Sequence, residues 1–324
     1  MNRFFSALIV GGTLALAPES GIAQDFPTRP LKWVSPWPAG GTNDILSRMI
    51  ARELEKVIGK PVVIDNRPGA AGTIGSDFVA KSDPDGYTIV LGSTPTHATA
   101  RAAYPQLPYD PVKDFAPITL VGTTPNVLIV RPTLDVKSVP ELIAYAKANP
   151  GKLNFYSSGI GSSQHLSAEL FKKMAGIDMQ HIPYKGQALG LTDLMGGRID
   201  VAFDNISALL PHIQEGKVRA LAVTPPDRAK ALPNIPSISD AGLPGYDASV
   251  WFGAFAPSGV PDAILEKLNA DILASMRTPE LMTRMTELGV QNIGSTRAAF
   301  GEFYRKDIAK WSDIIGTINA APKQ

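Results

Sequence analysis

One turn limits the fold of this chain more than any other stretch. It reads Ser35-Pro36-Trp37-Pro38-Ala39-Gly40-Gly41-Thr42-Asn43-Asp44. It follows the short apolar run 31–34 and precedes the segment 46–58, where apolar residues recur at helical spacing. The sequence therefore predicts a strand, a glycine-containing turn and a helix. The first backbone N–H groups of such a helix suit an anion, a carboxylate as much as a phosphate, and the indole of Trp37 offers a flat apolar wall beside them.

The N-terminus has the features of a secretory signal peptide over residues 1–23. Arg3 supplies a positive charge, residues 4–17 are apolar, and residues 21–23 are small, as at a cleavage site. The apolar core is shorter than the ~20 residues that a membrane span needs, and no later stretch is long and apolar enough to cross a bilayer. We therefore expect an exported, soluble periplasmic protein whose mature chain begins near Gln24.

Composition excludes several classes of partner. The formal net charge is +1, and it is unchanged when residues 1–23 are removed because Arg3 and Glu19 leave together. This balance gives no reason to expect nucleic acid or an anionic membrane surface as a partner. The chain has no cysteine, so a disulfide framework and a lipidation site are both excluded. The roughly 300 mature residues exceed what one hydrophobic core usually serves, which predicts two lobes in a monomer.

Three strand-loop-helix units open the mature chain. Their loops, 35–43, 65–75 and 92–97, are rich in small or hydroxyl residues. In a parallel sheet such loops gather at the C-terminal edge of the strands, where open α/β sheets bind ligands. The candidate ligand-binding residues of this first lobe are Trp37, Ala39, Gly40, Gly41, Thr42, Ser93 and Thr94.

A second lobe repeats this arrangement. Residues 110–119 are expected to be irregular, and the apolar strand 126–131 to cross into the second lobe. The loop 158–166 then has glycines and hydroxyls before a helix, as the first loop does. Its candidate ligand-binding residues are Gly161, Ser162, Ser163 and His165.

The chain is expected to return to the first lobe through the strand 249–256. Helical patterns follow at 262–276, 279–288 and 297–318, and the apolar stripe of the last is expected to pack on the first lobe. These patterns predict a first lobe made of 24–126 and 249–324, and a second lobe made of 127–248.

Together these stretches resemble the Bug-type extracytoplasmic solute receptors, the binding proteins of tripartite tricarboxylate transporters. The matching pieces keep one order along the mature chain, with Ala71 where the family often has glycine: 36–44, 65–75, 85–88, 159–166, Pro183-Tyr184-Lys185-Gly186, 200–204, 220–224, Trp251-Phe252-Gly253 and Ala256-Pro257. The resemblance implies an α/β two-lobe periplasmic-binding-protein fold of the Venus-flytrap, type II-like kind. It also implies chain crossings near 123–130 and 247–256, and a ligand held between the lobes by loop amides and water. No cofactor is implied.

Five polar or aromatic side chains remain to be interpreted. Asp44 is read as a carboxylate that braces its loop or matches the helix dipole, because it would repel a ligand carboxylate. His165 is expected to line the cleft, and Tyr184 lies in a loop that overhangs it. Asp204 ends a strand before a helix, so it either receives a ligand amine or caps the helix. Trp251 is expected to be a buried aromatic of a hinge strand.

The residue types indicate binding without catalysis or metal. No G-x-S-x-G elbow, cysteine nucleophile or P-loop occurs, and His97, His181 and His212 lack metal-ligand spacing. We expect a receptor that closes on a small carboxylate or amino-acid-like ligand and passes it to membrane transporter subunits. Two alternatives stay open: a ligand-loaded partner of a membrane sensor kinase, and an exported α/β hydrolase using the serines near His165.

Overall fold

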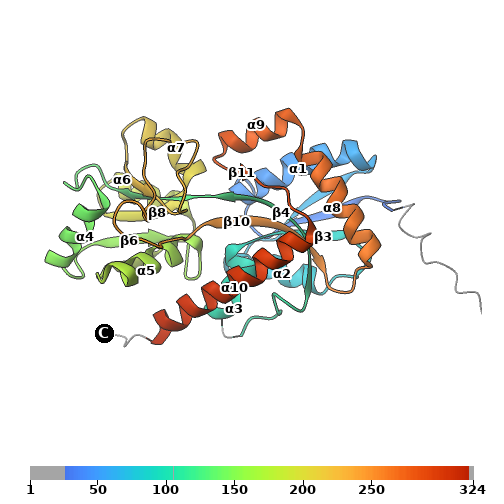
Figure 1. Cartoon of the computed structure of the whole chain (residues 1–324), viewed down its shortest axis with the longest axis horizontal. Helices are drawn as coiled ribbons and strands as arrows, with labels where there is room; N and C mark the ends of the chain where they lie inside the picture. Colours follow the sequence, from blue (N-terminus) through green and yellow to red (C-terminus); the bar gives the residue numbers. More distant parts are fainter. Residues whose placement is uncertain (1–25, 105, 321–324) are drawn as a thin grey trace, which may run out of the picture.

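The computed structural model of the chain describes residues 26–104 and 106–320 as two α/β lobes joined by long strands (Figure 1). This confirms the predicted fold class. The predicted signal peptide, 1–23, lies outside the described residues. Within the described ranges, no helix has both the length and the apolar character that a membrane span requires.

The first lobe is built on a six-stranded sheet with the order β11-β4-β10-β3-β1-β2. Strands β1, β2 and β3 run parallel, so their C-terminal ends meet at one edge, as the sequence predicts. Strand β10 runs antiparallel between β3 and β4. The strands of this lobe are β1 (Leu31–Ser35), β2 (Val62–Asn66), β3 (Thr88–Ser93), β4 (Phe115–Thr124), β10 (Val250–Pro257) and β11 (Gln291–Asn292). Its helices are α1 (Thr42–Ile58), α2 (Thr73–Ala80), α3 (Ala100–Ala103), α8 (Asp262–Met276) and α9 (Pro279–Glu287).

The second lobe is built on a five-stranded sheet with the order β7-β6-β8-β5-β9. Strands β6, β7 and β8 are parallel, and β5 is antiparallel to β8 and β9. The loops after β6 and β8 therefore open toward the same edge. The strands are β5 (Asn126–Val130), β6 (Asn154–Ser157), β7 (Gln180–Pro183), β8 (Val201–Asn205) and β9 (Arg219–Val223). The helices are α4 (Val139–Ala148), α5 (Ser163–Ala175), α6 (Gln187–Met195) and α7 (Ile206–Gln214).

The expectation of irregular chain over 110–119 was wrong, because β4 begins at Phe115. Pro117 discouraged a strand at this place, since proline cannot donate to a ladder. In the structure Pro117 lies where the register between β4 and β10 shifts, opposite Phe255. Such a bulge is one of the places where a strand tolerates proline.

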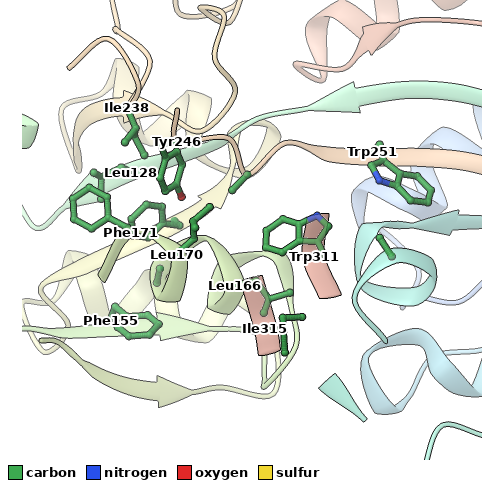
Figure 2. Packing of buried hydrophobic residues seen from close by; sticks show 14 of the residues in the cluster. Leu128, Phe155, Leu166, Leu170, Phe171, Ile238, Tyr246, Trp251, Trp311 and Ile315 are labelled. Atoms are coloured by element: carbon green, nitrogen blue, oxygen red, sulfur yellow. The ribbon is translucent and has the colours of Figure 1, made fainter. Parts of the chain in front are cut away.

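Helix α10 (Arg297–Ala320) extends along both lobes (Figure 1). Its first half packs on lobe 1, where Tyr304 meets the ring of Trp251 at 5.8 Å. Figure 2 shows Trp311 and Ile315, further along the helix, beside Leu166 of α5 in lobe 2. The predicted packing of this stripe on the first lobe was therefore incomplete, because Trp311 and Ile315 pack on the second.

A hinge forms where the chain passes between the lobes. Pro125 separates β4 from β5, and Thr224 ties this crossing to the returning chain. Asn126 N donates to Thr224 Oγ1 at 3.0 Å, and Ala248 N donates to Thr224 O at 3.2 Å. Trp251 is fully buried just beyond, with its indole N–H donating to Asp307 at 2.7 Å, so its predicted buried position is confirmed.

Candidate functional site

Hydrogen bonds to the Asp44 carboxylate hold the loop between β1 and α1 in place. The Asp44 carboxylate accepts from Gly40 N at 2.8 Å and from Asn66 Nδ2 at 2.8 Å, and Arg48 lies 3.0 Å away. Asn66 Nδ2 also donates to the carbonyl of Trp37 at 3.2 Å. Burial opposes the charge, but Arg48 and the loop donors hold the pKa of Asp44 below its usual value. The predicted bracing role of Asp44 is confirmed.

The start of α1 presents backbone donors that the protein itself leaves free. Among the described residues, no acceptor faces the amides of Thr42, Asn43 or Asp44. Gly41 is the N-cap and has no side chain to bond them. Ala39 and Gly40 are exposed and Trp37 is half-buried, so a ligand can reach this end of the helix.

Ser93 ends β3, Thr94 follows it, and both are almost fully buried. Thr94 Oγ1 accepts from Trp251 N at 3.0 Å, and Ser93 N donates to Thr96 Oγ1 at 2.9 Å. Both residues thus hydrogen-bond to partners in their own lobe and hold the loop 92–97 in place. Their contact with a ligand remains a prediction.

The second lobe presents a similar helix start at α5. Ser162 is the N-cap, and its Oγ accepts from His165 N at 3.3 Å. Gly161 N donates to His165 Nδ1 at 3.3 Å. Across the part of the chain that the structure covers, the amides of Ser163 and Gln164 meet no acceptor. The N-terminus of α5 therefore offers free donors, as that of α1 does.

Asp204 lies behind this loop, fully buried at the end of β8. It accepts from Tyr156 OH at 2.5 Å, Gln164 Nε2 at 3.0 Å and Asn205 N at 2.7 Å. Burial raises the pKa of Asp204, while these three donors oppose that rise. The carboxylate connects the start of α5, through Gln164, with the start of α7, through Asn205. It therefore braces the second lobe from within.

Tyr184 follows β7 and is half-buried. Its hydroxyl donates to Asp193 of α6 at 2.7 Å, and its ring meets that of Tyr156 edge-on at 6.1 Å. The hydroxyl is thus held by α6, which leaves the ring as the part available to a ligand.

Hydrogen bonds join the loops of the two lobes beside the helix starts. Thr42 Oγ1 lies 3.0 Å from Ser207 Oγ of α7, and Tyr104 OH donates to the carbonyl of Ile160 at 2.9 Å. These contacts join loops that carry candidate ligand-binding residues, so the starts of α1 and α5 each adjoin a contact between the lobes. We take these loops together as one candidate interlobe site. The sequence reading missed Tyr104 and Ser207, although a hydroxyl after β8 repeats the pattern of the other two loops.

A serine–histidine pair in this lobe bears on the hydrolase alternative. Ser157 Oγ lies 2.6 Å from His181 Nε2. Ser157 is fully buried, however, and its Oγ also binds the backbone of Gly159. A nucleophile must reach its substrate, so this geometry supports the loop rather than catalysis.

A separate groove of about 600 Å³ lies along α2, on the outside of lobe 1. Three of its cations are paired with acids at 2.6–2.8 Å: Arg29 with Asp85, Arg67 with Asp65 and Lys81 with Asp77. It is a solvated, ion-paired surface and takes no part in the interlobe site. The described residues also contain no cluster of three histidine or carboxylate side chains able to hold a metal ion.

Comparison with known families decides the assignment. The model of the tripartite tricarboxylate transporter family receptor matches residues 46–320. This chain belongs to that receptor family. The receptor is 35% identical to BugT of Bordetella pertussis over 93% of each chain, which supports the Bug-type resemblance.

Two solved structures are similar to this receptor over nearly its whole length. One is R. palustris Rpa4515 with adipate, 39% identical, with a TM-score of 0.84 over 91% of this chain and 99% of the other. The second is MatC from Rhodopseudomonas palustris with bound malate, 33% identical, with a TM-score of 0.81 over 90% and 100%. Both are two-lobe relatives, in agreement with the fold described above.

Proposed function

We propose that this receptor closes on a small carboxylate, with a dicarboxylate as the first choice, and delivers it to a membrane transporter. The observation that carries the proposal is the pair of helix starts, α1 and α5, on opposite lobes, each beside a hydrogen bond that crosses between the lobes. Their first amides have no acceptor among the described residues. Neither loop, 35–43 or 157–166, contains arginine or lysine. The charge of a bound anion would therefore be met by N–H groups, hydroxyls and water.

The binding free energy that such contacts supply is sufficient for a receptor. Hydrogen bonds to a charged group contribute ~1.5–3 kcal/mol each, and a helix N-terminus adds ~0.3–1 kcal/mol, up to ~2 when partly buried. Several such contacts reach the about 8 kcal/mol that micromolar binding requires. A closed cleft favours them further because less water competes for the donors.

Similarity supports the dicarboxylate class. Rpa4515 and MatC, named above, hold adipate and malate, which carry two carboxylates each. In this receptor one carboxylate would take the donors of α1 or α5, and Trp37 would contact the carbon chain. Closure is a hinge motion at Pro125 and Thr224, and the ligand would shift the population toward the closed form by its differential affinity. Export to the periplasm and a monomeric state belong to the same proposal.

A thermal-shift screen across mono-, di- and tricarboxylates and amino acids tests this function. A ligand at 100 times its Kd adds about 2.7 kcal/mol to the free energy of unfolding, which is readily detected. We expect dicarboxylates to give the largest shifts. Ser163→Ala should weaken the shift, because the hydroxyl lies at the first turn of α5, whereas Ser82→Ala, whose hydroxyl binds the Phe78 carbonyl in lobe 1, should not. Shifts with amino acids alone would contradict the ligand class, and turnover of the ligand would contradict the receptor assignment.

A further inference from the structure

Two histidines in ring contact hydrogen-bond to the loop 157–163 of lobe 2. The rings of His165 and His181 lie 4.3 Å apart and are tilted by 35°, and the ring of Phe155 stacks on His181 at 4.9 Å. His165 belongs to α5 and His181 to β7, so the pair joins two elements beneath the loop 157–163.

Each imidazole holds one part of this loop. His165 Nδ1 accepts from Gly161 N at 3.3 Å. His181 Nε2 meets Ser157 Oγ at 2.6 Å, and the same oxygen accepts from Gly159 N at 3.1 Å. The first bond requires His165 Nδ1 to be without a proton, since only then is it an acceptor. The loop path that presents the amides of α5 thus depends on neutral imidazole.

The surroundings keep both rings neutral at neutral pH. Burial lowers the pKa of His165 to about 4, with the charge of Lys172 adding to the effect. Burial likewise lowers the pKa of His181 to about 4; His165 and Lys172 reinforce this, and Glu169 opposes it. The charged groups around the pair are Lys172 and Glu169, 2.9 Å apart, with Asp178 3.9 Å from the amine of Lys172. Among the described residues, no carboxylate hydrogen-bonds to either imidazole. The positive charge gained on protonation would therefore have no acidic partner in direct contact.

We propose that His165 and His181 are positioning residues of the ligand site, and that their protonation releases the loop and with it the ligand. This inference rests on the proposed function. Protonation removes the acceptor of Gly161 and makes His181 Nε2 a donor to Ser157 Oγ, and it places two like charges 4.3 Å apart near Lys172. An acidic environment would therefore lower the affinity of the receptor by displacing the loop 157–163.

Conservative variants separate this role from simple packing. His165→Asn places an amide oxygen near the position of Nδ1, and His181→Gln places an amide near the position of Nε2, so each keeps a hydrogen-bonding group without titrating. The double variant H165N/H181Q removes both titrating groups, and its affinity at acidic pH is compared with its own affinity at neutral pH. His212→Gln, in the last turn of α7, is the matched control for removal of a lobe-2 histidine outside the pair.

The first measurement is calorimetric titration with adipate and malate at pH 7.5 and pH 4. Two groups that are half protonated at pH 4 reduce the affinity about twofold each, so the wild type should lose about fourfold more affinity than the double variant. Protonation of the ligand affects all proteins alike and cancels in this ratio. Equal losses in the wild type, H212Q and the double variant would overturn the proposal.

The second measurement needs no ligand. The amide NMR signals of Gly159 and Gly161 should shift with the titration of the two imidazoles in the wild type and H212Q, and should not shift in H165N/H181Q. Stationary glycine signals during histidine titration would overturn the positioning role. If the signals respond but neither carboxylate binds at neutral pH, the proposed ligand class fails while the support of the loop stands.

Discussion

Thr42 of lobe 1 and Ser207 of lobe 2 meet side chain to side chain, with their hydroxyl oxygens 3.0 Å apart. The contact joins the first turns of α1 and α7 across the site. It therefore joins the two lobes beside the candidate ligand-binding loop 35–43. Tyr104 and Ile160 make the corresponding contact between α3 and the loop before α5.

Removing these contacts should open the ligand-free receptor. A neutral hydrogen bond contributes ~0.5–1.5 kcal/mol, so Ser207→Ala should lower the ratio of closed to open molecules by up to about tenfold. Tyr104→Phe removes the hydroxyl, keeps the ring and should act in the same direction. Small-angle scattering of the ligand-free protein would show an increased radius of gyration when Ser207→Ala and Tyr104→Phe are combined. An unchanged radius, equal to that of the Ser82→Ala control, would mean that these bonds do not hold the lobes.

Truncation of Asp204 should cost more than its conversion to an amide. Asp204→Ala leaves Tyr156, Gln164 and Asn205 without their shared acceptor inside a fully buried site. Each unsatisfied group costs ~1–3 kcal/mol, so we expect a loss of at least about 3 kcal/mol in urea unfolding. Asp204→Asn keeps one acceptor oxygen and should lose clearly less. Equal losses in the two variants would show that the hydrogen bonds are not what the carboxylate supplies.

Helix α10 should stabilise the second lobe as well as the first. Trp311 is 2% exposed and lies against Leu166 and Leu170 (Figure 2). Truncating a buried tryptophan costs ~3–5 kcal/mol, so Trp311→Ala should lower the free energy of unfolding by that amount. Hydrogen exchange should also quicken in α5. Val57→Ala, at a 43% exposed side chain of α1, serves as the control. Exchange that quickens in lobe 1 alone would contradict the packing of α10 on lobe 2.

Most elements of the fold could be predicted from local sequence patterns. The helix 262–276 was predicted with the bounds that α8 has, because capping and helical periodicity act over a few residues. β4 was not predicted. Its Pro117 is tolerated at a bulge against β10, which the local sequence does not reveal. The final helix was assigned to one lobe because an apolar stripe does not say how many partners it has.

The sequence predicted the loops of the candidate site but not the hydrogen bonds that join them. The glycine and hydroxyl loops of both lobes were recognisable from their place before helices. Asp204, by contrast, could not be assigned before its three donors were known, and they come from positions 156, 164 and 205. The contact between Thr42 and Ser207 joins residues 165 positions apart, which only the arrangement of the lobes brings together.

Acid should destabilise the receptor through its buried histidines. His97 is fully buried, stacked on Phe255 at 4.1 Å, and burial lowers its pKa to about 3. The folded state keeps it neutral while the unfolded chain binds a proton below pH ~6.5. Its contribution to stability is therefore complete above that pH and is lost progressively as the pH falls toward 3. His97→Gln should be less stable at neutral pH but show a shallower decline of the urea midpoint between pH 6.5 and 4. Parallel declines in the two proteins would contradict this assignment.

Calorimetric titration of adipate into the wild type and Gly41→Leu at neutral pH tests the central claim most directly. Gly41 has an ordinary φ of −76°, and an added Cβ would meet only the Pro38 carbonyl at 3.4 Å, so the variant should fold. Its side chain would crowd the free amides of α1. Gly316→Leu, in an open position on α10, is the control. We predict one site per chain, micromolar or tighter affinity for the wild type and the control, and at least about tenfold weaker binding by Gly41→Leu, a loss of about 1.4 kcal/mol. Full affinity in Gly41→Leu, or no binding of adipate or malate by the wild type, would contradict the account.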